Sequence, residues 1–263
     1  METGGKCRTK VADAAVSFGL LQTVPNTIVS YIAALSGYDF IVLDSEHGTF
    51  YEPDYLPAML ATGTFDLTTI VRLRGQVPTS LGRCLDMGID GIMVPNVTTA
   101  HQATELVKAM HFPPKGSRGY AGSIARSSGY GLELENYQRG APEPFLSVMI
   151  ESEEGVDNVE EIVRVEGLSA VVVGHYDLSA SLGIPGDFAQ PAYERALSRI
   201  EGAAATHRKT LGSAPHPDYP VEKLIARGHR LITLGVDTKL IREAMTAQIK
   251  AGNQAIAASG VRL

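Results

Sequence analysis

Residues 145–183 contain two apolar runs, Phe145-Leu-Ser-Val-Met-Ile-Glu151 and Ala170-Val-Val-Val-Gly174, and a carboxylate marks the end of each. Glu151 closes the first run, and Asp177 follows shortly after the second. Continuous apolar runs of this length are typical of strands buried on both faces, as in a parallel sheet. Residues at the carboxyl ends of such strands face the ligand site of a barrel. Two carboxylates in that place can share one hard divalent cation through oxygen ligands.

A second interpretation of the same two residues stays open at this stage. Asp177-Leu-Ser is also typical of a helix start, and a helix N-terminus beside a metal suits a substrate carboxylate. Acidic caps are common, however, so Glu151 could be an ordinary strand-end residue and Asp177 an ordinary N-cap.

Strand-like and helical segments alternate along the whole chain. The expected strands are Ser17–Leu21, Phe40–Leu43, Thr68–Leu73, Gly91–Val94, Phe145–Ile150, Ala170–Val173, Thr210–Ser213 and Leu231–Leu234. The expected helices between them include Thr27–Ser36, Pro53–Thr62, Pro78–Met87, Thr99–Met110, Val156–Val165, Tyr193–Thr206 and Val221–Ala226. This alternation predicts an α/β fold of the (β/α)8 TIM-barrel type. A doubly wound open sheet is the alternative, but no glycine fingerprint for a dinucleotide follows the early strands. A final helix near 238–258 could close the barrel or pack on another subunit.

Composition places the chain among ordinary globular proteins. Its 263 residues suit one barrel domain over residues 11–263, preceded by a polar tail at 1–10 that we expect to be flexible. The formal net charge of −6 argues against nucleic acid or an anionic membrane as a partner. Two cysteines form neither a disulfide framework nor a zinc cluster, which favours a reducing, cytoplasmic compartment. No apolar run approaches the length of a membrane span.

Further chemical groups follow the second and third expected strands. Asp44, Glu46 and His47 stand where a barrel keeps its catalytic residues, and a histidine there can act as a general base oriented by a carboxylate. The alternative is a polar loop. Arg72 ends an apolar strand and could bind a carboxylate or enolate oxygen through its planar fork, or form a structural ion pair.

The long irregular segment from Phe112 to Pro144 is rich in glycine and proline. A segment of this length within a compact domain is usually functional, and it could lie over the catalytic face or make subunit contacts. Its Arg118 and Arg126 could bind anions or be solvated. Lysine is nearly absent from the expected strand ends, since only Lys209 stands next to one of them.

Motifs spread over most of the chain resemble the metal-dependent (class II) pyruvate aldolases of the 4-hydroxy-2-oxoheptanedioate aldolase type. That family includes 2-keto-3-deoxy-L-rhamnonate aldolase and fungal macrophomate synthase. The matching pieces, in the family's order, are Gly37-Tyr-Asp-Phe40, Leu43-Asp-Ser-Glu-His-Gly48, Val71-Arg72, Leu85-Asp-Met-Gly-Ile-Asp-Gly-Ile-Met-Val-Pro95, Phe112-Pro-Pro-Lys-Gly-Ser-Arg-Gly119, Ala125-Arg126, Met149-Ile-Glu151 and Asp177-Leu-Ser-Ala-Ser-Leu-Gly183.

The resemblance implies a role for each matching residue. Glu151 and Asp177 would bind a divalent metal (Mg²⁺, Mn²⁺ or Co²⁺), to which pyruvate binds through its carboxylate and keto oxygens. Arg72 would stabilise the enolate oxygen. His47, oriented by Asp44, would move protons, while Asp86 would reach the histidine of a neighbouring subunit. The substrate would be bound by Arg72 together with Gly174, Met149 and His175. The backbone amides of Tyr176 and Asp177 would hold its carboxylate.

The resemblance also implies an assembly and a range of reactions. The last helix would be exchanged between subunits of a homohexamer built from dimers. The expected activity is cleavage or formation of 4-hydroxy-2-oxo acids from pyruvate and an aldehyde. Oxaloacetate decarboxylation, or a macrophomate-synthase-like coupling, is an alternative that uses the same enolate.

Two positions depart from the family pattern. Met149 replaces the usual glutamine and His175 the usual proline. Both lie near the expected pocket, so they could retune substrate choice or metal hydration. They also leave open a non-catalytic relative that binds a metal or a keto acid.

Overall fold

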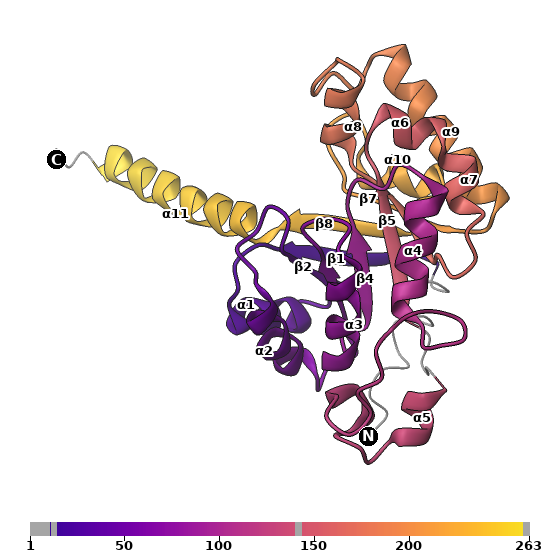
Figure 1. Cartoon of the computed structure of the whole chain (residues 1–263). Coiled ribbons are helices and arrows are strands. Elements are labelled where there is room, and N and C mark those ends of the chain that lie inside the picture. Colours follow the sequence, from indigo (N-terminus) through magenta and orange to yellow (C-terminus); the bar gives the residue numbers. More distant parts are fainter. Residues whose placement is uncertain (1–10, 12–14, 140–143, 260–263) are drawn as a thin grey trace.

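Eight parallel strands close into a barrel in the computed structural model, which describes residues 11, 15–139 and 144–259 (Figure 1). The strands pair in chain order, and the last pairs back to the first. They are β1 (Ser17–Gln22), β2 (Phe40–Asp44), β3 (Thr68–Arg72), β4 (Gly91–Val94), β5 (Phe145–Ile150), β6 (Ala170–Val173), β7 (Thr210–Ser213) and β8 (Leu231–Val236). The closed ring confirms the predicted (β/α)8 barrel and excludes the open sheet.

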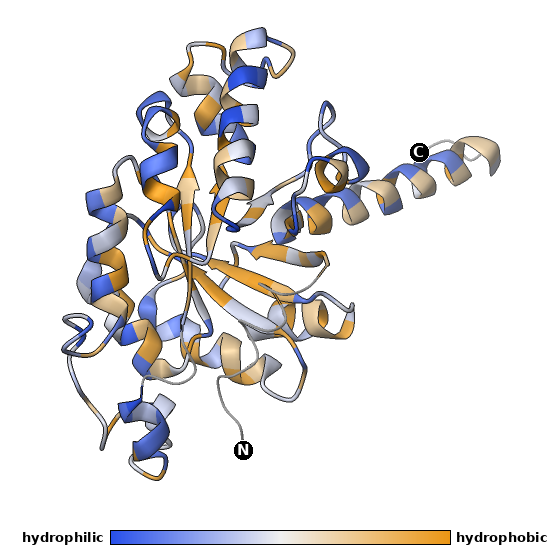
Figure 2. Ribbon diagram, turned by 90° about the vertical axis from the view of Figure 1, so that its right-hand side faces the viewer, coloured by the Kyte–Doolittle hydropathy of each residue, from blue (hydrophilic) through white to orange (hydrophobic). Residues whose placement is uncertain are grey.

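The apolar runs of the sequence form the core of this barrel. Every residue of β2 to β6 is buried, as expected for strands with lumen on one side and helices on the other. Inward side chains such as Phe40, Met93 and Met149 fill the lumen, and a larger cluster lies between the strands and the helices. Figure 2 shows the strands as the most hydrophobic part of the ribbon.

The chain also contains helices, most of which surround the barrel (Figure 1). They are α1 (Thr27–Leu35), α2 (Glu52–Thr62), α3 (Pro78–Met87), α4 (Ala100–Met110), α5 (Leu134–Gln138), α6 (Glu153–Asp157), α7 (Val159–Val163), α8 (His175–Ser181), α9 (Pro191–Thr206), α10 (Val221–Ala226) and α11 (Asp237–Ser259). Most predicted boundaries agree with these within two residues. The predicted helix 156–165 is instead two short helices that meet at Asn158.

The helix after β6 begins earlier than expected. The sequence suggested Asp177 as its N-cap, but α8 starts at His175 with Gly174 as the cap residue. Asp177 therefore lies in the first turn of α8, where a carboxylate interacts favourably with the helix dipole.

The last helix leaves the barrel. Asp237 holds its first turn against the end of β1, because its carboxylate accepts hydrogen bonds from Thr23 and from the backbone N–H of Val24. Beyond that anchor α11 extends away from the other elements (Figure 1). Leu240, Ile241, Met245 and Ile249 are exposed along it. Among the described helices, none is both long and apolar enough to span a membrane.

The long segment after α4 contains a short 3-10 turn at Arg126–Ser128 and helix α5. The aromatic rings of Phe112, Tyr120 and Tyr137 pack against one another within it. The segment's last part, residues 140–143, and the predicted tail at 1–10 lie outside the described residues.

Candidate active site

A cavity of about 250 Å³ lies at the carboxyl ends of the strands. Arg72 from β3, Met149 from β5 and Gly174 after β6 contribute to its wall. The complete lining is Leu21, Val42, Arg72, Met93, Met149, Val172, Val173, Gly174, His175, Tyr176, Asp177, Ser213, Ala214, Pro215, His216, Thr233 and Val236. All six residues predicted to bind substrate are therefore gathered around one space.

Arg72 is held at the cavity by Asp44 on the neighbouring strand. The β2–β3 register places these residues opposite each other, and the guanidinium donates to both carboxylate oxygens, with Nε to Oδ1 at 2.8 Å and Nη2 to Oδ2 at 2.9 Å. Burial disfavours the Asp44 anion, but the Arg72 guanidinium more than offsets this and lowers the pKa of Asp44. This fork fixes the arginine in its charged form at the cavity wall.

The His47 side chain contacts a different carboxylate from the one expected. Asp44 was predicted to orient this imidazole, but Asp44 Oδ1 instead accepts the backbone N–H groups of Glu46 and His47. The nearest carboxylate oxygen to the ring is Glu46 Oε2, 4.0 Å from His47 Nε2. The His47 side chain is 68% exposed and does not line the cavity. The turn after β2 thus carries the histidine at the rim.

Glu151 is a buried carboxylate next to the cavity. It accepts the backbone N–H of Asn96 at 2.6 Å, and Asn96 has a left-handed φ of 49° that aims this group. Burial raises the pKa of Glu151 to about 7, with further contributions from the charges of Glu46 and Asp177. Gly174, which lines the cavity, lies directly against the Glu151 carboxylate.

The two predicted metal ligands present oxygen donors of the right kind. Burial is the main cause of the raised pKa of Glu151, and the Asp177 charge is close enough to that carboxyl to raise it further. Among the described residues no group of three or more His, Cys, Asp or Glu forms a metal cluster. Two carboxylates are sufficient for a hard cation that keeps water or substrate oxygens as its other ligands. The donor set therefore fits Mg²⁺ or a similar cation.

The two residues that depart from the family pattern have different surroundings. Met149 belongs to the apolar lumen. His175 is buried, and its Nδ1 hydrogen-bonds the Tyr193 hydroxyl. Burial and the neighbouring His216 lower the pKa of His175 to about 3. His216, which sequence reasoning missed, lies in the loop after β7, where no motif marked it.

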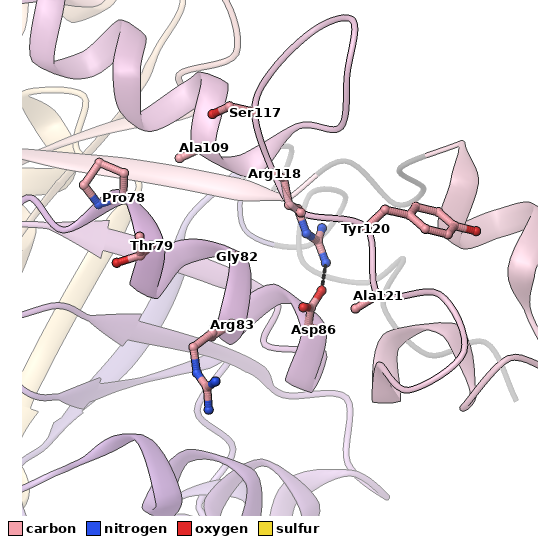
Figure 3. Close-up of a pocket in the computed structure, with 11 residues that line it drawn as sticks. Pro78, Thr79, Gly82, Arg83, Asp86, Ala109, Ser117, Arg118, Tyr120 and Ala121 are labelled. Carbon is pink, nitrogen blue, oxygen red and sulfur yellow. Dashed lines mark hydrogen bonds and ion pairs between the residues drawn. The ribbon is translucent and has the colours of Figure 1, made fainter.

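Asp86 lies elsewhere in the subunit. It is on α3, where its carboxylate accepts from Arg118 at 2.6 Å (Figure 3). The same carboxylate accepts from the Tyr137 hydroxyl at 3.0 Å. Asp86 and Arg118 border a second cavity of about 410 Å³ that shares no lining residue with the first. The Arg118 side chain is only 8% exposed and pairs with Asp86, whereas Arg126 is partly exposed and donates to the carbonyl oxygen of Met87.

Lys209 stands at the opposite end of the barrel from the cavity. It precedes β7, and its ammonium donates to the carbonyl oxygens of Val165 and Leu168. Burial lowers its pKa, and its role in this position is structural.

Comparisons with known proteins agree with this geometry. The model of the HpcH/HpaI aldolase/citrate lyase family matches residues 19–244. The chain is 32% identical to 2-keto-3-deoxy-L-rhamnonate aldolase of Salmonella gallinarum, over 88% of this chain and 86% of that protein. It is 33% identical to hydroxypyruvate/pyruvate aldolase of Delftia acidovorans, with the same coverage.

A solved structure of a member of this family has the same fold. An HpcH/HpaI aldolase/citrate lyase family protein from Burkholderia cenocepacia superimposes with a TM-score of 0.89 at 26% identity, covering 95% of this chain and 99% of that one. The matched residues include Asp44, Arg72 and Glu151. The chain therefore belongs to the HpcH/HpaI aldolase/citrate lyase family, and it is an enzyme of the lyase class.

Proposed function

We propose that the protein is a divalent-metal-dependent aldolase that joins pyruvate to an aldehyde or cleaves the resulting 4-hydroxy-2-oxo acid. The observation that carries this proposal is the placement of Arg72, Glu151 and Asp177 around the carboxyl ends of β3, β5 and β6. A cation and a fixed guanidinium can stabilise an enolate without a Schiff-base lysine.

Arg72 would bind the oxygen on which negative charge develops. A guanidinium has five N–H donors, and three of those of Arg72 face Asp44 and Glu46. Two remain for a substrate oxygen. Because Asp44 already holds the side chain, this donor needs no reorganisation when the charge appears.

The opposite wall would bind the rest of the keto acid. The first N–H groups of a helix have no intrahelical acceptor, and those of Tyr176 and Asp177 lie in the first turn of α8 beside the cavity. They suit a substrate carboxylate. Glu151 and Asp177 would hold the cation, which when bound supplies Lewis-acid polarisation of the substrate oxygens.

His47 would move the proton of the aldol hydroxyl. It lies at the exposed rim, where an aldehyde would enter. The same rim could meet Asp86 of a second copy, as the resemblance implies. Oxaloacetate decarboxylation needs no such hydroxyl proton, so His47→Ala should depress aldol cleavage far more than decarboxylation, by about 10²–10⁴.

A direct assay tests the proposal. Purified protein is freed of metal with EDTA and then incubated with pyruvate and an aldehyde in the presence of Mg²⁺, Mn²⁺ or Co²⁺. We expect product only with added cation, and none from Glu151→Ala or Asp177→Ala. Full turnover in excess EDTA would reject the metal site. Activity with oxaloacetate alone would identify the decarboxylase.

We also propose that the enzyme works as a homo-oligomer, with α11 packed on a second copy. The exposed apolar side chains of α11 favour this arrangement, because such a stripe on a projecting helix is normally covered. The expected oligomer is a hexamer built from dimers, and light scattering measures its mass.

A further inference from the structure

The first residue of α8 is tied to a neighbouring helix through its side chain. His175 Nδ1 hydrogen-bonds the hydroxyl of Tyr193, which lies on α9. Both residues are buried, so the bond lies in a medium of low dielectric constant, where it is stronger than in water. It joins the start of α8 to the interior of the helix layer.

The same turn of α8 carries Asp177, one of the two proposed metal ligands. Within residues 11, 15–139 and 144–259, no hydrogen bond or ion pair holds the Asp177 carboxylate. The place of this carboxylate in the cavity wall therefore depends on the backbone of α8.

Other side-chain hydrogen bonds tie α8 only toward its C-terminal end. Ser179 accepts the backbone N–H of Gly186 and Ser181 accepts that of Glu153, each at 2.9 Å. Among the described residues, the imidazole of His175 is the one side chain of the first turn that hydrogen-bonds another element. The first turn consequently relies on this bond.

Residue 175 is also the first helical position of α8, where the family pattern has proline. Proline suits that position because its ring fixes φ at about −65° and it lacks an N–H that would have no intrahelical acceptor. Histidine brings no such constraint. The bond to Tyr193 fixes through the side chain what a proline ring would fix in the backbone.

We propose that the Tyr193 hydroxyl, acting through His175, is the positioning group that holds the first turn of α8 and with it Asp177. The inference rests on the proposed function, in which Asp177 binds the cation. The other ring nitrogen, His175 Nε2, already has no hydrogen-bond partner among the described residues. Loss of the hydroxyl leaves the buried ring with none, which is unfavourable. The ring then shifts to regain a partner, and the first turn of the helix shifts with it.

Tyr193→Phe removes the hydroxyl and keeps the ring. We expect the Kd for Mn²⁺, measured by isothermal titration, to rise about fivefold, the worth of one hydrogen bond. The value of kcat at saturating Mn²⁺ should stay within about twofold, because the loaded site has the same groups. Tyr219→Phe is the matched control, since Tyr219 packs on Tyr193 but its hydroxyl donates to Glu194 on α9. Equal rises in the two variants would overturn the inference.

A proline variant separates positioning from general packing. His175→Pro fixes the backbone directly, so adding Tyr193→Phe to it should leave the Mn²⁺ affinity as it is in His175→Pro alone. A further fivefold loss in that background would mean that the hydroxyl does not act through His175. The double variant contains no unpaired imidazole, so this comparison holds even if Tyr193→Phe alone is too unstable to titrate.

Hydrogen–deuterium exchange of the metal-free protein gives a readout without activity. Amides of α8 should exchange faster in Tyr193→Phe and at the wild-type rate in Tyr219→Phe. Unchanged exchange in Tyr193→Phe would reject the inference, whatever the enzyme does. If exchange rises but the wild-type protein neither binds Mn²⁺ nor turns over substrate, the proposed function fails while the positioning of α8 stands.

Discussion

A Cβ atom on residue 174 would lie 2.2 Å from Oε2 of Glu151. Gly174 has an ordinary negative φ of −86°, so it is not required by backbone strain. It is required because the carboxylate occupies the space that any larger residue would need. The glycine therefore sets the position of a proposed metal ligand.

Substitution Gly174→Ala should displace the Glu151 carboxylate and weaken cation binding. We expect loss of most metal-dependent turnover, by about 10²-fold, with partial recovery at high metal concentration. Isothermal titration with Mn²⁺ measures the affinity. Gly202→Ala is the control, because a Cβ there meets nothing within 4 Å and the site lies in helix α9. Unchanged affinity in Gly174→Ala would contradict the assignment of Glu151.

Arg72→Lys should lose about 10²–10³ in kcat, because an ammonium cannot hold Asp44 in a fork and present further planar donors to substrate. The fold should survive in this variant, since a buried positive charge still faces Asp44. Circular dichroism checks the fold, and oxaloacetate decarboxylation measures the rate. Near-normal decarboxylation by the lysine variant would rule out the role of Arg72.

Metal-free protein should become less stable between pH 5 and pH 7. Burial raises the pKa of Glu151 from 4.5 to about 7, so the folded protein keeps a proton that the unfolded chain has already released. The free energy of unfolding then falls as pH rises through this window, by about 2–3 kcal/mol at 1.36 kcal/mol per pH unit.

Urea denaturation in EDTA at pH 5 and pH 7.5 measures this change. Glu151→Gln provides the reference, because it retains the shape and cannot ionise. The fall should be smaller in the variant by the same 2–3 kcal/mol. A fall of equal size in both proteins would assign it to other groups.

Charges on the apolar stripe of α11 should break the proposed oligomer. Met245→Glu together with Ile249→Glu would place two carboxylates among exposed apolar side chains. We expect a shift to smaller species in size-exclusion chromatography with light scattering. Thr246→Glu with Asn253→Glu adds the same charge on the side of the helix that carries Lys239 and Lys250, and should leave the mass unchanged. If the wild-type protein is already monomeric, the proposed packing of α11 is wrong.

The strands were predictable because they are continuous apolar runs whose ends coincide with turn or polar residues. Even the Asp44–Arg72 pair follows from this pattern, since each residue ends its strand and neighbouring parallel strands end at the same edge. The start of α8 was not predictable, because its cap is Gly174, which makes no capping hydrogen bond through a side chain.

Contacts that depend on loop geometry were also out of reach. The left-handed φ of Asn96 directs its N–H to Glu151, and no sequence pattern specifies that angle. His216 reaches the cavity through the loop after β7, where its ring packs on Phe188. The Arg72 guanidinium forks onto Asp44, and the His47 ring lies near Glu46 instead. The sequence did not indicate which of the two carboxylates the arginine would bind.

The position of Lys209 keeps its amine away from the carbonyl chemistry that we propose for the cavity. The strand that follows it runs from Thr210 to Ser213, so at about 3.3 Å per residue the ammonium is on the order of 13 Å from the cavity end. Two backbone carbonyls hold it there. Sodium borohydride added with pyruvate, which traps imines irreversibly on lysine, should therefore leave this residue unmodified and the enzyme fully active.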